Sequence, residues 1–178
     1  MKKQILVPVL IIIIVAGMLL GMSFGLNKIA VANAQAEHQK IMETILPGSK
    51  VFTVEPYAGD DANIRSIHKG ETGFVVETVT YGYAGDITML IGVTNEGKVT
   101  GLVVRDMSDT LGLGGNALTD HEFLAQFLNT SGEAEVGTNI DAISGATVTS
   151  KAITRSINSA VAYVTGADTD SGATSWGG

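Results

Sequence analysis

The chain has 178 residues and a net charge of −7, from 11 Lys and Arg residues against 18 Asp and Glu residues. This acidic balance argues against a nucleic-acid-binding protein, since such proteins normally present a basic face. The absence of cysteine excludes disulfide bonds, cysteine-ligated iron–sulfur clusters and a cysteine nucleophile. The three histidines, His38, His68 and His121, lack the spacing of metal ligands on a helix, so no metal site is expected.

Residues 1–26 are predicted to form a membrane anchor. The run ILVPVLIIIIVAGMLLGMSFGL, at positions 5–26, carries no charge and is long enough to cross a bilayer of about 30 Å. Lys2 and Lys3 precede the run, which predicts a single-pass protein of the cell membrane with a cytoplasmic N-terminus and an extracytoplasmic body. The alternative is a cleaved signal peptide, because ANA and AQA, ending at Ala34 and Ala36, resemble cleavage sites. The apolar run is longer than is usual in such a peptide, which favours the anchor.

The body of the chain alternates turn signals with strand-like runs. Residues 27–48 are predicted to form a stem helix closed by Pro47 and Gly48, ahead of a domain at 49–165. Within that domain, residues 74–80, 87–94 and 99–105 are predicted to be strands, and NEGK at 95–98 indicates a hairpin turn.

Two helices are predicted after the strands. Residues 119–129 are predicted to be a short helix that begins with a capping box formed by Thr119 and Glu122. Residues 148–164 are predicted to be a longer amphipathic helix, with Lys151, Arg155, Ser156 and Asn158 off its apolar stripe. Antiparallel strands with separate helices predict a small α+β domain. Residues 166–178 show no periodicity and are predicted to be a flexible tail.

A seven-residue pattern occurs twice, as DAISGAT at 141–147 and as DTDSGAT at 168–174. The first copy precedes the longer predicted helix, whose N-terminal amides and dipole form a favourable site for a phosphate. The second copy lies in the predicted tail. On composition alone, the first copy is more simply an ordinary helix start, in which Asp141 or Ser144 is the cap and Gly145 makes the turn.

The segment DAISGATVTS resembles the flavin-attachment motif of the Rnf complex G subunits and of the C subunits of Na⁺-translocating NADH:quinone reductases. In those families FMN is joined through its phosphate to the last threonine of the motif, which here is Thr147. Residues 82–104 are similar to the family's strand pair, and SDTLGLGG at 108–115 is similar to its glycine loop, with Asp109 and Leu111 in place of Glu and Pro. The resemblance implies covalent FMN on Thr147 and cofactor contacts from Ser144, Gly145, Ala146, Asp109, Thr110, Gly112, Leu113 and Gly114. No FMN is expected on Thr174, because the second copy lies in the predicted tail with no helix behind it.

The resemblance also implies a function. Such a protein would relay electrons within a complex that couples electron flow between ferredoxin and NAD⁺ to Na⁺ or H⁺ translocation. Its partners would be the other membrane and peripheral subunits and a flavin transferase. Two alternatives remain open, a stand-alone anchored flavoprotein and a non-redox anchored module. GLGGNA at 112–117 also fits a loose dinucleotide-binding pattern, although no second parallel strand follows it.

Overall fold

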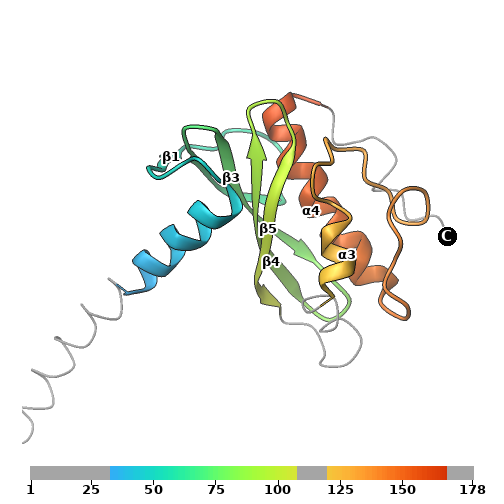
Figure 1. Cartoon of the computed structure of the whole chain (residues 1–178). Coiled ribbons are helices and arrows are strands. Elements are labelled where there is room, and N and C mark those ends of the chain that lie inside the picture. The colour runs from blue at the N-terminus through green and yellow to red at the C-terminus, as the bar shows by residue number, and fades with distance from the viewer. Residues whose placement is uncertain (1–32, 108–119, 168–178) are drawn as a thin grey trace, which may run out of the picture. The chain divides into compact units, whose positions relative to one another are not determined.

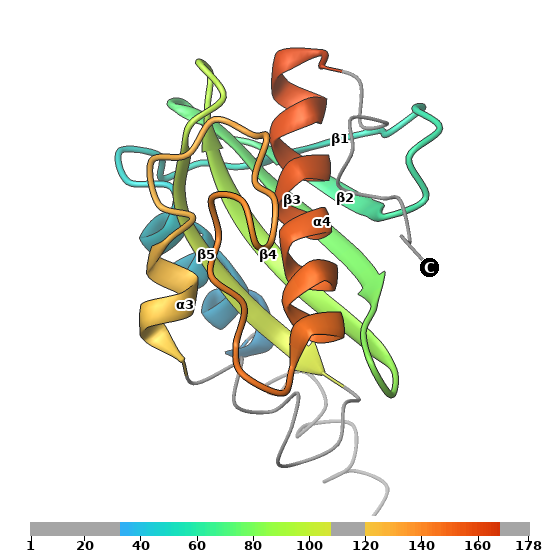
Figure 2. The same ribbon diagram turned by 90° about the vertical axis from the view of Figure 1, so that its right-hand side faces the viewer.

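The computed structural model describes residues 33–107 and 120–167. In these ranges, five strands form one antiparallel sheet in the order β1-β2-β3-β4-β5. The strands are β1 (Thr53–Glu55), β2 (Ile64–Lys69), β3 (Gly73–Tyr81), β4 (Asp86–Thr94) and β5 (Val99–Met107). Helix α4 (Thr147–Thr165) crosses one face of the sheet, and the short helix α3 (His121–Ala125) lies on the same side (Figures 1 and 2). The predicted α+β class is confirmed, while the predicted anchor lies outside the described residues.

The three predicted strands correspond to β3, β4 and β5, each extended by one or two residues at its ends. The predicted hairpin turn joins β4 to β5, where the N–H of Thr94 donates to the carbonyl of Lys98 at 2.8 Å. Gly97 adopts a φ of 82° in this turn, a conformation that favours glycine. Local turn chemistry and the strand-like runs on either side of the turn were therefore sufficient to predict this part of the sheet.

Strands β1 and β2 were not predicted, because neither has a clear alternation of polar and apolar residues. The pairing of β2 with β3 is irregular between Ile64 and Ser66, where β2 carries a bulge. The bulge lets Ile64 and Ile67, three residues apart, both enter the same core. An odd spacing of this kind hides a strand from a search for alternating residues.

The main core lies between α4 and the sheet. Helix α4 contributes Ile153, Ile157 and Val161, each at most 2% exposed. The sheet contributes residues that alternate along β4, where Ile87, Met89, Ile91 and Val93 are fully buried. Phe123 and Phe127, from α3 and the segment that follows it, complete the cluster. This core holds α4 and α3 on one face of the sheet.

The opposite face of the sheet carries a smaller cluster. Met42, Ile45 and Leu46 pack there against Val75 of β3 and Leu90 of β4. The helical segment at 33–45 ends at this point, followed by Gly48 with a φ of 92°. The segment therefore ends just before Pro47 and Gly48, the two residues expected to close it.

Helix α3 begins one residue later than the predicted capping box requires. Its N-cap is Asp120, whose carboxylate accepts a hydrogen bond from the N–H of Phe123 at 2.9 Å. The predicted capping box of Thr119 and Glu122 is therefore wrong, and Thr119 itself lies outside the described residues. Aspartate is a more favourable N-cap than threonine, which accounts for the start at Asp120. The helix is also shorter than predicted. It ends at Ala125, and the N–H groups of Gln126, Phe127 and Leu128 bond three residues back instead of four.

Helix α4 agrees with the prediction in its length but not in its polar face. Ser156 was expected off the apolar stripe, yet it is fully buried and bonds to Thr80 of β3, with 2.8 Å between the hydroxyl oxygens. Thr80 also donates to the carbonyl of Ala152 at 3.1 Å. A buried hydroxyl is tolerated where it has a partner, and here the partner comes from a strand distant in sequence.

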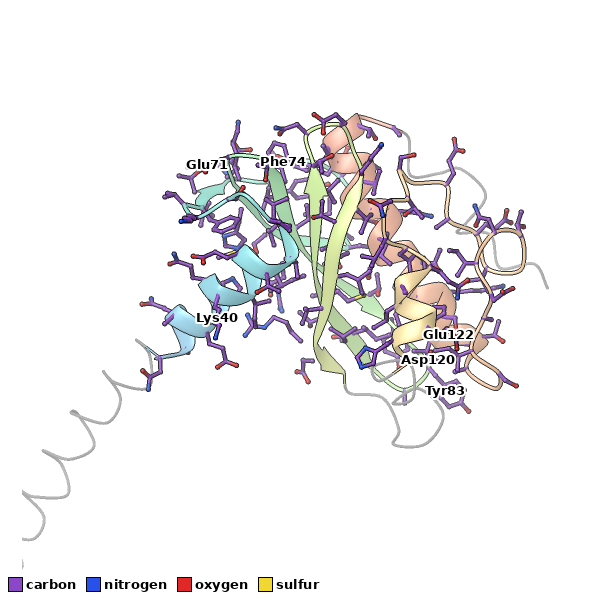
Figure 3. All side chains as sticks on the ribbon, viewed as in Figure 1. Lys40, Glu71, Phe74, Tyr83, Asp120 and Glu122 are labelled. Carbon is purple, nitrogen blue, oxygen red and sulfur yellow. The ribbon has the colours of Figure 1, made fainter. Side chains whose placement is uncertain are left out.

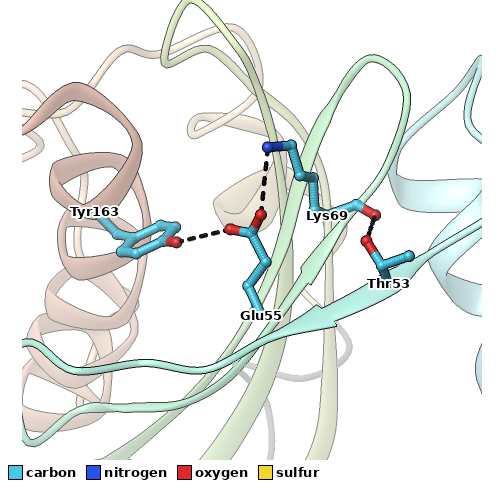
Figure 4. A network of polar contacts seen from close by, with 4 residues as sticks. All are labelled: Thr53, Glu55, Lys69 and Tyr163. Atoms are coloured by element: carbon cyan, nitrogen blue, oxygen red, sulfur yellow. Dashed lines mark hydrogen bonds and ion pairs between the residues drawn. The ribbon is translucent and has the colours of Figure 1, made fainter.

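The C-terminal half of α4 is tied to β1 and β2 by a polar network (Figure 4). The hydroxyl of Tyr163 donates to Glu55 Oε2 at 3.3 Å, and Lys69 Nζ lies 3.3 Å from Glu55 Oε1. Phe74 of β3 packs edge-on against the Tyr163 ring, with 5.7 Å between the ring centroids. The short strand β1 is thus held by side chains as well as by its pairing with β2.

Candidate functional site

The segment DAISGAT forms a tight turn that leads into α4. The N–H of Ala146 donates to the carbonyl of Ile143 at 2.9 Å, which places Ser144 and Gly145 at the two corners. Gly145 has a φ of 78°, and a positive φ at the third residue of such a turn favours glycine. The predicted role of Gly145 as the turn residue is confirmed.

The ordinary helix cap expected at this turn is wrong. The N-cap of α4 is Ala146, and the cap has no side-chain hydrogen bond, so neither Asp141 nor Ser144 fills this position. Ser150 stabilises the turn from within the helix instead. Its hydroxyl accepts from the N–H of Ile143 at 3.1 Å and donates to the carbonyl of Ala146 at 3.0 Å. The first turn of α4 therefore lacks the side-chain acceptor that a capped helix supplies to its N–H groups.

Thr147 is the first residue of α4 and its side chain is exposed. Thr149, two residues later, is 1% exposed, and Ala146 is 5% exposed. Of the two threonines in this first turn, Thr147 is exposed and Thr149 is buried. The structure thus brings Ser144, Gly145, Ala146 and Thr147 together in one turn, with the hydroxyl of Thr147 at the positive end of a 19-residue helix.

A cleft lies beside this turn, between α3 and residues 141–143. It has a volume of about 380 Å³ and is lined by Asp120, Glu122, Phe123, Gln126, Asp141, Ala142 and Ile143. Figure 3 shows Asp120 and Glu122 at the end of the domain opposite Glu71 and Phe74. The cleft therefore has a partly apolar lining and an acidic rim of three carboxylates.

Gln126 joins the two walls of the cleft. Its side-chain amide donates to the carbonyl of Asp141 at 3.3 Å and accepts from the N–H of Asp141 at 2.8 Å. This two-point contact holds the first residue of the DAISGAT turn against the segment that follows α3. No local pattern pointed to Gln126, because the two residues are distant in the chain and a glutamine is usually a surface residue.

The hairpin between β3 and β4 lies at the same end of the domain. The N–H of Gly82 donates to the carbonyl of Gly85 at 2.8 Å and closes the turn. Tyr83 in this turn is 61% exposed, and Figure 3 shows it at the end of the domain that carries Asp120 and Glu122. The cleft and the hairpin are therefore two surfaces at this end of the domain that a large planar ligand could contact.

The predicted glycine-loop residues lie outside the described residues. They are Asp109, Thr110, Gly112, Leu113 and Gly114, and Thr174 also lies outside. Their flanks are described, because β5 ends at Met107 and α3 is capped by Asp120. The described sheet is antiparallel throughout, whereas a dinucleotide-binding fold has a parallel sheet, so the alternative interpretation of GLGGNA is not supported.

An FMN group fits the chemistry of the residues at this site. A phosphodiester needs a hydroxyl for its attachment, and the exposed residue Thr147 has one. The negative charge of the phosphodiester is stabilised by a helix N-terminus. The cleft volume of about 380 Å³ lies within the range of roughly 300–1,000 Å³ that is typical of small-molecule sites. The site therefore offers both an attachment point and space for a ring system.

Comparisons with known proteins agree with this chemistry. Residues 82–162 match the model of the FMN-binding domain family, a range that begins in the β3–β4 hairpin and includes most of α4. The chain is 34% identical over 178 residues to the G subunit of the ion-translocating oxidoreductase complex of Methanosarcina acetivorans, covering 90% of this chain and 93% of that relative.

Two further relatives match over about half of each chain. The G subunit of the proton-translocating ferredoxin:NAD(+) oxidoreductase complex of Clostridium ljungdahlii is 38% identical over 99 residues, 52% of this chain and 53% of the relative. The G subunit of the Na(+)-translocating ferredoxin:NAD(+) oxidoreductase complex of Acetobacterium woodii is 34% identical over 98 residues, 50% of this chain and 47% of the relative. The resemblance inferred from the sequence is thus confirmed at the level of the family.

Proposed function

The chain belongs to the family of G subunits of ion-translocating oxidoreductase complexes, and from this premise we propose that it relays electrons through an FMN covalently bound to Thr147. FMN accepts and donates electrons singly or in pairs, while the protein holds the ring and sets its potential. The observation that carries the proposal is that Thr147 is an exposed residue at a helix start without a side-chain cap.

Attachment of FMN requires an activated flavin. With a flavin dinucleotide as donor, Thr147 Oγ1 attacks the phosphorus next to the flavin and forms a phosphodiester bond. The phosphoanhydride bond breaks, a nucleoside monophosphate leaves with the bonding electron pair, and the hydroxyl proton is released. Nothing in the sequence resembles an enzyme that attaches its own flavin, so the proposal includes a separate flavin transferase.

The charges of the site favour a covalent bond over free binding. The cleft beside the turn carries the carboxylates of Asp120, Glu122 and Asp141, and none of the described Lys or Arg residues lines it. Residues 108–119 also contain no Lys or Arg. A free FMN phosphate carries close to two negative charges and would be repelled, whereas the diester carries one. A covalent bond retains the cofactor without a cluster of basic residues.

The proposed setting is a membrane complex. The relatives named above belong to ion-translocating complexes, two of them acting on ferredoxin and NAD⁺, which supports membrane and peripheral subunits as partners. No helix in the described part of the chain is long and apolar enough to cross a membrane. The proposed single-pass anchor is the uncharged run at 5–26, outside that part, with the FMN domain on the extracytoplasmic side.

The attachment site is tested by peptide mass mapping after co-expression with a flavin transferase. The FMN adduct is expected on Thr147, and Thr147→Ala should abolish it. The matched control is Thr174→Ala, which removes the threonine of the second DxxSGAT copy and should leave the adduct intact. Flavin that persists in Thr147→Ala, with the adduct on Thr174, would refute the assignment.

Co-purification separates the complex from the two alternatives. If the chain is yellow and is isolated with multi-spanning partners, the electron-relay function in a complex is supported. If it is yellow but always purifies alone, it is a stand-alone anchored flavoprotein. If it is colourless in cells that hold the transferase, it is a non-redox module.

A further inference from the structure

We propose that Ser150 and Gln126, two residues outside the DxxSGAT pattern, hold the DAISGAT turn in the conformation that the flavin transferase binds. They are positioning residues, because they bond to the main chain of the turn and not to the reacting atoms. The inference rests on the proposed function, and it adds to that function how the folded domain presents Thr147 to the transferase.

The residues of the pattern are accessible in the folded domain. Four of the five residues that the two copies share are exposed, namely Asp141, Ser144, Gly145 and Thr147. The fifth, Ala146, is 5% exposed and anchors the turn to the domain. A transferase can therefore contact the pattern without unfolding it, so that the shape of the folded turn contributes to binding.

Ser150 joins the two ends of the turn. Its hydroxyl accepts from the N–H of Ile143 and donates to the carbonyl of Ala146, the first and the fourth residue of the turn. A hydroxyl in a helix commonly donates to the carbonyl four residues before it, as Thr154 does to Ser150 at 2.9 Å. The bond from Ile143 goes beyond this pattern, because it ties the chain that enters the turn to the helix that leaves it. Ser150 is fully buried, so both bonds are shielded from water.

Gln126 holds the chain where the pattern begins. Its side-chain amide bonds to both main-chain groups of Asp141, the first residue of the pattern. The DAISGAT segment is therefore held near its start by Gln126 and near its end by Ser150. A segment that is already ordered loses less conformational entropy when a partner binds it. These two contacts should thus strengthen the binding of the transferase without taking part in the transfer.

The second copy of the pattern lacks an equivalent of Ser150. The third residue after Thr147 is Ser150, whereas the third residue after Thr174 is Gly177, which has no hydroxyl. Ordering the residues of a turn costs conformational entropy, which the single hydrogen bond that closes the turn does not offset. The two copies share the same five residues, and the first also has support from outside the pattern.

The test measures flavin transfer to the full-length chain carrying Thr174→Ala, which leaves one copy of the pattern. A flavin transferase is supplied with a flavin dinucleotide, the concentration of the chain is varied, and covalent flavin is measured against time. Ser150→Ala should raise the KM for the chain about fivefold, the effect of losing about one hydrogen bond from the bound conformation. The kcat should stay unchanged, because Ser150 does not contact the reacting atoms.

The matched control is Ser159→Ala on the same helix. Ser159 is 2% exposed, and its hydroxyl accepts from Asn63 Nδ2 at 3.2 Å, away from the turn. Both variants lose a buried hydroxyl with a partner, so both should be less stable in urea unfolding. Ser150→Ala should raise the KM, and Ser159→Ala should not. An equal rise in the two variants would trace the effect to stability alone and would refute the positioning role.

A second pair of variants does not depend on a buried serine. Gln126→Met removes both bonds to Asp141 at a half-buried position. Asn158→Leu removes a similar pair, because Asn158 bonds to the N–H and the carbonyl of Ala134 at 3.2 and 2.8 Å. Gln126→Met should raise the KM by a factor similar to that of Ser150→Ala, and Asn158→Leu should match the parent. A KM for Gln126→Met equal to that of the parent would overturn the inference, even if Ser150→Ala failed to fold.

The outcomes separate this inference from the proposed function. If the parent carries FMN on Thr147 and the KM is the same in all the variants, the positioning role is wrong and the proposed function stands. If the parent carries no FMN on Thr147 after reaction with the transferase, the proposed function is wrong and this inference falls with it.

Discussion

Thr78 and Thr80 lie on the side of β3 that faces α4, and both are buried. The Thr80 hydroxyl bonds to Ala152 and Ser156, whereas Thr78 Oγ1 has no hydrogen-bond partner among the described residues. A buried hydroxyl without a partner costs free energy, and one that is paired contributes modestly to stability. Two identical substitutions on one strand should therefore act in opposite directions.

We expect Thr78→Val to stabilise the domain by about 1 kcal/mol, because it removes an unpaired hydroxyl with little change in volume. Thr80→Val should destabilise it by about 1 kcal/mol or more, because Ser156 loses its partner. Urea unfolding at neutral pH measures both, and each variant is the control for the other. Equal losses of stability in the two variants would contradict the difference in hydrogen bonding.

At the scale of elements, Tyr163 joins the end of α4 to β1 through Glu55. Burial raises the pKa of the Tyr163 hydroxyl, and the Glu55 carboxylate raises it further. The unfolded chain therefore ionises this tyrosine at a lower pH than the folded chain does. The contribution of Tyr163 to stability is complete below pH about 10 and is lost as the pH rises through the folded pKa.

The test compares the free energy of unfolding of the Tyr163→Phe variant with that of the unchanged protein between pH 8 and pH 11. Near pH 8 the variant should be less stable by about 0.5–1.5 kcal/mol, the contribution of one hydrogen bond. The difference should narrow above pH 10, because phenylalanine has no proton to lose. Tyr81→Phe, at a residue 65% exposed, is the control for the other tyrosines. A difference that is constant with pH would show that the Tyr163 pKa is not raised.

At the scale of the whole molecule, two facing glycines let the end of the helical segment at 33–45 approach the sheet. Gly92 of β4 and Gly101 of β5 are paired across the strands. A Cβ added at Gly92 would overlap the carbonyl oxygen of Ile45, and one at Gly101 would lie 2.8 Å from the Cα of Ile45. Thr100 donates to the same carbonyl at 2.5 Å. The main chain at Ile45 therefore lies in close contact with the main chains of β4 and β5 at Gly92 and Gly101.

The whole-molecule prediction is that the mature protein keeps its N-terminus. The uncharged run at 5–26, preceded by Lys2 and Lys3, should stay in the membrane and carry the domain outside. Intact-mass measurement of the membrane fraction should give the full chain plus FMN. A mature start at Gln35 or Glu37, directly after the two candidate cleavage sites, would show that the anchor is removed.

The local sequence was sufficient to predict those elements that depend on a single residue type or on a run of neighbouring residues. Strand-like runs bounded by turn signals predicted β3, β4 and β5. The helical period predicted α4, and Gly145 predicted the turn before Thr147. The motif itself identified Thr147 as the candidate residue. These features depend on neighbours in the chain, so the chain alone encodes them.

Tertiary structure decided the features that depend on residues distant in the sequence. The bulge of β2, the burial of Ser156 against Thr80 and the contact of Gln126 with Asp141 each require a partner from another element. The cleft is the clearest case, because its two walls come from α3 and from the turn before α4. No local pattern records that these walls meet, since packing around a shared core brings them together.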